Sequence, residues 1–132
     1  EAFKGIDTLH KLYAVLRKSW SSSTAYKSCQ SEWVSEDPSY GQCAITATLV
    51  YDMFGGSIHR IRVEGGGTHY FNKITGQYVD LTREQFDLYN IEVAYEPNET
   101  MQREYCCKNP DTNARYRQLQ RNIIAYLKNN ED

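Results

Sequence analysis

Apolar residues recur at steps of three and four near both ends of the chain, which is the spacing of one face of an amphipathic helix. The first stripe consists of Ile6, Leu9, Leu12, Tyr13, Leu16 and Trp20. It predicts a helix over residues 6–20. The second stripe consists of Tyr116, Leu119, Ile123, Ile124 and Leu127. It predicts a helix from Asp111 or Thr112 to about Lys128, and its basic residues expected on the solvent side are Arg115, Arg117 and Arg121.

A continuous apolar run with no polar face lies between Gly41 and the pair Gly55-Gly56. A glycine pair suits the end of a helix, so we predict a buried helix with Cys43 in its first turn. Its β-branched residues are Ile45, Thr46, Thr48 and Val50. Because such residues are weak helix formers, packing must stabilise this helix, and we expect it in the core.

Strand-like segments follow at residues 57–64, 68–74 and 77–81, separated by glycine-rich turns. A short helix is expected near residues 82–86, and the alternating segment 91–96 predicts one more strand. We therefore expect an α+β fold in which a cysteine-bearing helix packs on a short antiparallel sheet, with helices flanking it. At 132 residues, the chain has the usual length of one domain, here residues 1–132.

The charged residues, 15 Lys and Arg against 17 Asp and Glu, nearly cancel and form no long basic run. This disfavours a nucleic-acid partner. With neither a long apolar stretch nor a signal-peptide pattern, we expect a cytoplasmic protein without a membrane partner. The four cysteines have neither disulfide-scaffold nor zinc-finger spacing, so we expect reduced thiols, no metal and no other cofactor. The sequence does not indicate the oligomeric state.

Cys43 is the first candidate for chemistry. A cysteine in the first turn of a helix lies at the positive end of the helix dipole, beside unpaired backbone N–H groups, and both favour the thiolate. A nucleophile is therefore one interpretation. The other is a small core residue, because free cysteine is among the most buried residue types.

His69 and Asp80 are brought together by the hairpin that Thr75-Gly76 predicts. If this is a two-residue turn, Ile74 pairs with Gln77, and His69 and Asp80 point to one face as diagonal neighbours. A carboxylate there would hold an imidazole N–H and stabilise the imidazolium that a thiolate requires. A slip of one residue would place the two on opposite faces. His59, in the preceding strand, has no evident partner and is expected to face solvent.

These segments resemble known enzymes. Gly41-Gln42-Cys43 is similar to the nucleophile motif of transglutaminases, and residues 69–72 and 78–82 resemble the His and Asp segments of that superfamily and of papain-like proteins. The intervals are shorter than in full transglutaminases, and Ala44 replaces the aromatic residue that commonly follows their cysteine. The resemblance implies a small papain-like or transglutaminase-like fold with a Cys43–His69–Asp80 triad.

A second resemblance covers most of the chain, from Trp33 into the C-terminal helix. Residues 41–47, 54–58, 69–72 and 80–86 are similar to the YunG-like bacterial family. That family is uncharacterised, so the resemblance implies no substrate.

Together these observations predict a cysteine-nucleophile hydrolase or acyltransferase that acts on an amide or ester in a peptide, a protein or a small molecule. Cys43 would attack the carbonyl, His69 would transfer the proton and Asp80 would orient His69. Gln42 and Trp33 are candidates for an oxyanion or substrate-binding role. The alternative is a non-enzymatic interaction module with Cys43 in the core. A redox-sensing domain using Cys43 or Cys106-Cys107 is a weaker third interpretation.

Overall fold

The computed structural model describes residues 5–63, 67–88, 91–106 and 108–129. The glycine-rich turn expected at Gly65 and Gly66 and the redox role considered for Cys107 fall on residues outside these ranges. The elements are α1 (Leu9–Ser19), η1 (Ser22–Thr24), η2 (Lys27–Glu32), α2 (Cys43–Phe54), β1 (Ser57–Arg62), β2 (Thr68–Ile74), β3 (Gln77–Val79), α3 (Glu84–Asp87), β4 (Glu99–Met101), α4 (Arg103–Cys106) and α5 (Pro110–Asn129).

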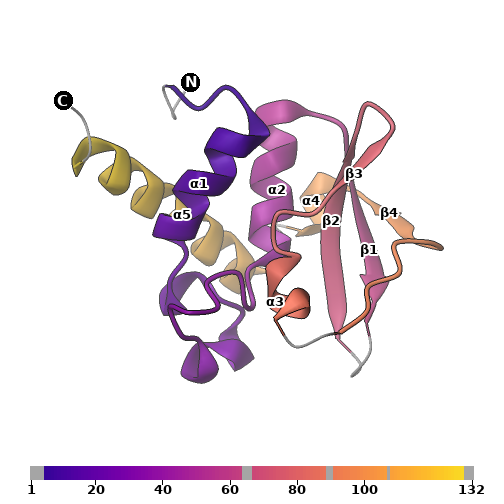
Figure 1. Ribbon diagram of the computed structural model, residues 1–132, viewed down its shortest axis with the longest axis horizontal. Coiled ribbons are helices and arrows are strands. Elements are labelled where there is room, and N and C mark those ends of the chain that lie inside the picture. The colour runs from indigo at the N-terminus through magenta and orange to yellow at the C-terminus, as the bar shows by residue number, and fades with distance from the viewer. Residues whose placement is uncertain (1–4, 64–66, 89–90, 107, 130–132) are drawn as a thin grey trace.

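The fold is α+β, as predicted, with an antiparallel sheet in the order β3-β2-β1-β4. Figure 1 shows α1, α2 and α5 gathered beside this sheet, with α2 nearest to it. The amide of Asn72 on β2 donates to the main-chain oxygen of Ala47 on α2 at 2.9 Å, in a buried position. This bond joins the central helix to the sheet that carries the candidate histidine.

The main core lies between the three long helices, where the amphipathic stripes predicted it. Its fully buried members include Leu12 and Leu16 of α1, Ile45 and Leu49 of α2, and Leu119 of α5. α1 begins at Leu9, later than predicted, because the side chain of Thr8 accepts a hydrogen bond from the Lys11 N–H at 3.1 Å and caps the helix.

The strand predicted at residues 91–96 is wrong. That segment is irregular, and the edge of β1 pairs with β4 instead. Burial nevertheless alternates along it: Ile91, Val93 and Tyr95 are half-buried, while the residues between them are exposed. A segment that lies with one side against the protein produces the same period of two as a strand in a ladder.

Arg115 and His59 also differ from expectation, since both are buried, with exposed fractions of 4% and 7%. The guanidinium of Arg115 donates to the Thr24 carbonyl at 3.2 Å and to Asp111 at 3.1 Å, so it joins α5 to η1. A basic residue on a helix can be buried where such acceptors meet it, and the Thr24 carbonyl is distant from Arg115 in sequence.

Candidate functional site

Cys43 is the first residue of α2, in the first turn as predicted, and its side chain is only partly buried. The loop before it depends on Gly41, whose φ is +76°. A Cβ atom at Gly41 would lie 2.9 Å from the Cβ of Cys29, too close for any other residue without rearrangement. This tight turn delivers Cys43 to the helix start with its sulfur at the protein surface.

His69 and Asp80 meet as the hairpin register requires. Ile74 pairs with Gln77 and Asn72 with Val79, which confirms the register expected from the Thr75-Gly76 turn. β3 ends at Val79, so Asp80 follows the strand directly. His69 Nε2 lies 2.7 Å from Asp80 Oδ2, and the two side chains are 1% and 5% exposed. A buried imidazole and a buried carboxylate therefore form a direct pair.

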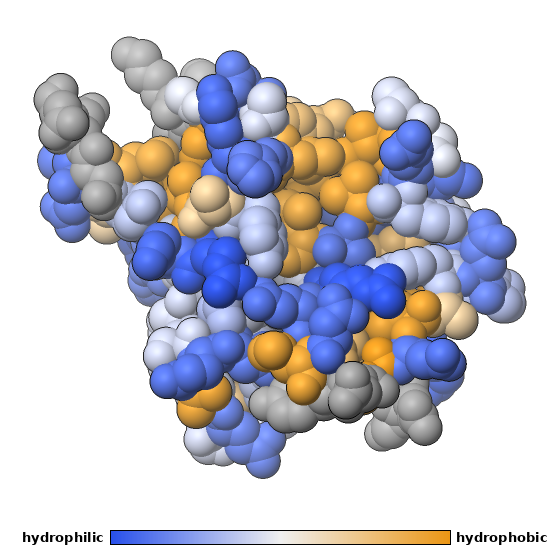
Figure 2. Space-filling view, viewed as in Figure 1, coloured by the Kyte–Doolittle hydropathy of each residue, from blue (hydrophilic) through white to orange (hydrophobic). Residues whose placement is uncertain are grey.

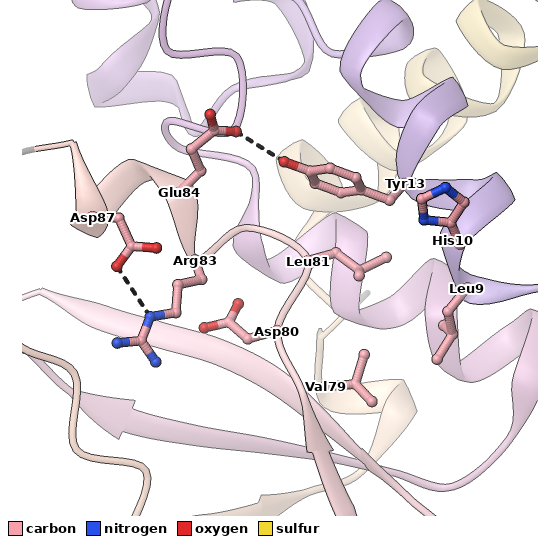
Figure 3. A pocket seen from close by; sticks show the side chains of 9 residues that line it. All are labelled: Leu9, His10, Tyr13, Val79, Asp80, Leu81, Arg83, Glu84 and Asp87. Atoms are coloured by element: carbon pink, nitrogen blue, oxygen red, sulfur yellow. Dashed lines mark hydrogen bonds and ion pairs between the residues drawn. The ribbon is translucent and has the colours of Figure 1, made fainter.

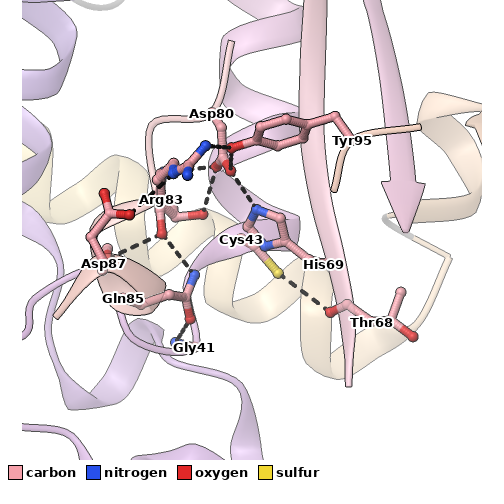
Figure 4. A network of polar contacts seen from close by, with 11 residues as sticks. Gly41, Cys43, Thr68, His69, Asp80, Arg83, Gln85, Asp87 and Tyr95 are labelled. Atoms are coloured by element: carbon pink, nitrogen blue, oxygen red, sulfur yellow. Dashed lines mark hydrogen bonds and ion pairs between the residues drawn. The ribbon is translucent and has the colours of Figure 1, made fainter. Parts of the chain in front are cut away.

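The sulfur of Cys43 lies beside the His69 ring (Figure 4), and its side chain interacts with that ring. The other ring nitrogen, Nδ1, is buried and has no hydrogen bond within the described part of the chain. Because Nε2 is occupied by Asp80, Nδ1 is the nitrogen left to exchange a proton with Cys43. Cys43 Sγ also lies 3.9 Å from the carbonyl oxygen of Thr68.

The environment of His69 favours its protonated form. Burial acts to lower the pKa of the imidazole, but the hydrogen bond with Asp80, the charge of that carboxylate and the neighbouring Cys43 side chain raise the pKa to about 9. At neutral pH this environment favours the imidazolium form of His69.

Asp80 is held by residues that the sequence analysis missed. The Tyr95 hydroxyl donates to Oδ2 at 2.7 Å, while the backbone N–H and hydroxyl of Thr82 lie 3.2 and 3.3 Å from Oδ1. Arg83 Nη1 donates in turn to the Tyr95 hydroxyl at 3.1 Å. Burial and the charge of Asp80 raise the pKa of Tyr95, which keeps its proton available for this bond. In the sequence, the alternation of apolar and polar residues over 91–96 was the signal that Tyr95 faces the protein.

Aromatic rings close the site around His69. The Phe86 ring meets the imidazole edge to face, with centroids 4.7 Å apart, and Phe71 stacks beside it at 6.3 Å. These contacts account for the 1% exposure of His69 and keep bulk water from its pair with Asp80.

Gln42 and Trp33 have structural partners. Gln42 is fully buried; its amide nitrogen donates to the Ser21 carbonyl at 3.0 Å and its oxygen accepts from Thr24 at 2.7 Å. This side chain cannot meet a ligand from solvent, so the oxyanion role predicted for it has no support here. The indole N–H of Trp33 donates to the Pro38 carbonyl at 3.1 Å, and its substrate-binding role stays a prediction.

A cavity of about 530 Å³ lies next to Asp80, between α1 and the segment 79–87 (Figure 3). Leu9, Val79 and Leu81 give it an apolar wall. Glu84 on its rim accepts a hydrogen bond from Tyr13 at 2.9 Å. Figure 2 shows apolar side chains gathered on this face between α1 and the β2–β3 hairpin. The cavity borders the carboxylate of the candidate site and not its sulfur, since neither Cys43 nor His69 lines it.

Cys29 and Cys43 are free thiols. Within the described ranges no group of three or more His, Cys, Asp or Glu residues is arranged to hold a metal ion. None of the described helices is both long and apolar enough to cross a membrane.

Comparison with known proteins gives one family. The family model described as YunG protein matches residues 8–128. A protein of Bacillus subtilis (strain 168), described as uncharacterized protein YunG, is 42% identical over 72 residues, which are 54% of this chain. The match spans 57% of that relative's own length, less than two thirds of it. No solved structure matches the chain with statistical significance.

Proposed function

This chain belongs to the YunG family, and from the geometry of its site we propose that it is a cysteine-nucleophile hydrolase or acyltransferase that acts on an amide or ester. The observation that carries the proposal is the bond of 2.7 Å between His69 Nε2 and Asp80 Oδ2, formed while the same ring meets the Cys43 side chain. A nucleophile, a base and a group that orients the base are the parts that covalent acyl transfer requires.

In the first half of the reaction, the Cys43 thiolate attacks the carbonyl carbon of the substrate and forms a tetrahedral oxyanion. Backbone N–H groups at the start of α2 are oriented to stabilise this negative charge. His69 then donates its Nδ1 proton to the leaving amine or alkoxide, the bond from carbon to the leaving group breaks, and a thioester with Cys43 remains.

In the second half, neutral His69 accepts a proton at Nδ1 from the incoming water or amine, which attacks the thioester. Loss of the thiolate then completes hydrolysis or acyl transfer. Asp80 accepts a hydrogen bond from the Nε2–H of His69 throughout, and hydrogen bonds from Tyr95 and Thr82 hold the carboxylate in place. The site thus works as a minimal papain-like or transglutaminase-like centre, and the acyl acceptor decides between the two outcomes.

The rival interpretation, an interaction module with Cys43 in the core, is less favoured because the Cys43 side chain is only partly buried. His69 and Asp80 are instead the buried members, and a buried charged pair is retained at a cost in desolvation. Peptides, proteins and small amides or esters all remain candidate substrates. A cytoplasmic location stays a prediction.

The test is acylation by a simple activated ester, p-nitrophenyl acetate, followed by peptide mapping. We expect an acetyl thioester on Cys43 that hydroxylamine removes, and a rate of formation at least about tenfold lower in His69→Ala, within the usual range for a lost general acid or base. His10→Ala provides the matched control, because His10 is exposed on α1. Failure to acylate Cys43 in the folded protein, or a rate that does not depend on His69, would refute the proposal.

A further inference from the structure

A second hydrogen-bonded chain crosses the same sheet, away from Cys43. Ser57 Oγ lies 2.7 Å from His59 Nε2, and His59 Nδ1 lies 2.9 Å from Asn98 Oδ1. Ser57 and His59 are two residues apart on β1 and therefore point to one face of the sheet. A hydroxyl, an imidazole and an amide oxygen are thus arranged in the order of nucleophile, base and orienting group.

The surrounding bonds determine where the protons lie. Asn98 Nδ2 donates to the Tyr95 carbonyl at 2.8 Å and lies 3.2 Å from the Tyr78 hydroxyl, so its Oδ1 is the atom turned to His59. That oxygen can only accept, which places the imidazole proton on Nδ1. The lone pair of Nε2 is then directed at the Ser57 hydroxyl, as a general base requires.

The imidazole is also fixed in place. Its ring stacks on Phe71 with centroids 5.7 Å apart and meets the edge of Tyr78 at 6.5 Å. His59 is 7% exposed, whereas Ser57 at the start of β1 is only half-buried and can be reached by a small molecule.

Lys73 adds a positive charge on this face. It lies directly opposite Ser57 in the register of β1 and β2, so the two Cβ atoms are about 5 Å apart. Its ammonium lies 5.3 Å from the centroid of the Tyr78 ring. A cation in this position favours the negative charge that develops on the carbonyl oxygen when Ser57 Oγ attacks the carbonyl carbon.

We propose that Ser57 is a second nucleophile, activated by His59, which takes the acyl group of an activated ester. Ser57 Oγ forms a bond to the carbonyl carbon as its proton moves to His59 Nε2. The bond from that carbon to the leaving oxygen then breaks, and the phenolate or alkoxide departs with the bonding electron pair. His59 passes the proton to the leaving oxygen or to water, and the ester on Ser57 is released by attack of water.

The orienting group sets the substrate class. Asn98 is neutral and stabilises an imidazolium less than a carboxylate does, so His59 is a weaker proton relay than His69. A leaving group that needs little protonation, such as a phenol, suits this site, whereas an amine does not. Tyr78, which is half-buried and packs edge to face on the buried Phe71, supplies an aromatic surface for such a group.

The test uses the Cys43→Ala variant, so that acylation by the cysteine cannot contribute. Treated with p-nitrophenyl acetate, it should release a burst of p-nitrophenolate and carry the acetyl group on Ser57, as located by peptide mapping. Ser57→Ala should abolish the burst, and His59→Gln should slow acetylation of Ser57 at least about tenfold, the lower end for loss of a general base. His10→Gln should have no effect.

A comparison within one folded molecule guards against a His59 variant that does not fold. Ser28 is exposed, and acetylation of Ser57 should be at least about tenfold faster than that of Ser28, as expected for a hydroxyl with a positioned base. Equal rates at the two serines, no adduct on Ser57, or a rate unaffected in a folded His59→Gln variant would overturn the proposal. Because the adducts map to different residues, failure at Ser57 and failure at Cys43 are distinguishable.

Discussion

At the scale of single residues, His69 determines how the candidate site behaves. A buried imidazole is ordinarily neutral, because burial penalises its charged form. Here Asp80 and Cys43 outweigh that penalty and raise the pKa to about 9. Tyr95 and Thr82 in turn donate hydrogen bonds to the carboxylate. The imidazolium is therefore stabilised by a hydrogen-bond network and not by a single contact.

Replacing Asp80 with Asn should lower the pKa of His69, because the hydrogen bond with Asp80 is the largest influence that raises it. The amide is nearly isosteric with the carboxylate but carries no charge, so the imidazole would titrate closer to its ordinary value of about 6.5. NMR titration of the His69 ring protons measures this shift directly.

An unchanged His69 titration in a folded Asp80→Asn variant would mean that the carboxylate does not set the charge of the imidazole.

At the scale of elements, the sequence predicted the register of neighbouring strands better than it predicted tertiary contacts. The Thr75-Gly76 turn fixed the register of β2 and β3, and that register brought His69 to Asp80. The sequence could not distinguish a strand from an irregular segment with alternating burial, so residues 91–96 were misassigned and Tyr95 was overlooked. Local patterns encode local geometry, whereas the partner of a buried polar group is set by tertiary contacts.

Gln42 and Arg115 illustrate this limit. Both are polar residues whose partners, Ser21 and Thr24, lie in the loop after α1. Gln42 appeared from sequence to be a ligand-binding residue and Arg115 to be a solvated one. In the structure, they anchor that loop to the start of α2 and to α5, and the loop thereby supports the position of Cys43.

Replacing Arg115 with Met should destabilise the protein, because the Thr24 carbonyl and Asp111 lose a buried donor. An unsatisfied buried group costs about 1 to 3 kcal/mol, so the free energy of unfolding should fall by about that amount in urea denaturation.

Arg117→Met is the matched control on the same helix, since Arg117 is exposed and its replacement should change the free energy of unfolding by about 0.5 kcal/mol or less. Equal effects of the two substitutions would show that the buried guanidinium does not stabilise the fold.

At the scale of the whole molecule, the helical layer and the sheet meet at Cys43, His69 and Asp80. The start of α2 supplies the sulfur, the start of β2 supplies the imidazole and the segment after β3 supplies the carboxylate. His59 and His69 both stack on Phe71, so the two histidine chains share one aromatic centre on the sheet.

The stability of the protein should depend on pH through His69. The pKa is raised from 6.5 to about 9 in the folded state, so the imidazolium stabilises the fold fully below pH 6.5, and this contribution is lost as the pH rises through about 9. The shift corresponds to a loss on the order of 3 kcal/mol at most across that window. Urea denaturation at several pH values, compared with His69→Gln, measures it. If the free energy of unfolding changed with pH in the same way in the unsubstituted protein and in His69→Gln across that window, the raised pKa would be contradicted.

The most direct test of the proposed nucleophile is the rate at which iodoacetamide alkylates each cysteine, resolved by mass spectrometry. At about pH 6 to 7 a thiol without stabilising partners is mostly protonated and reacts slowly. Our account predicts that Cys43 reacts faster than the comparably buried Cys29 at this pH, and that His69→Ala slows Cys43 about tenfold or more while His10→Ala does not. Equal rates at Cys43 and Cys29, or a Cys43 rate indifferent to His69, would contradict it.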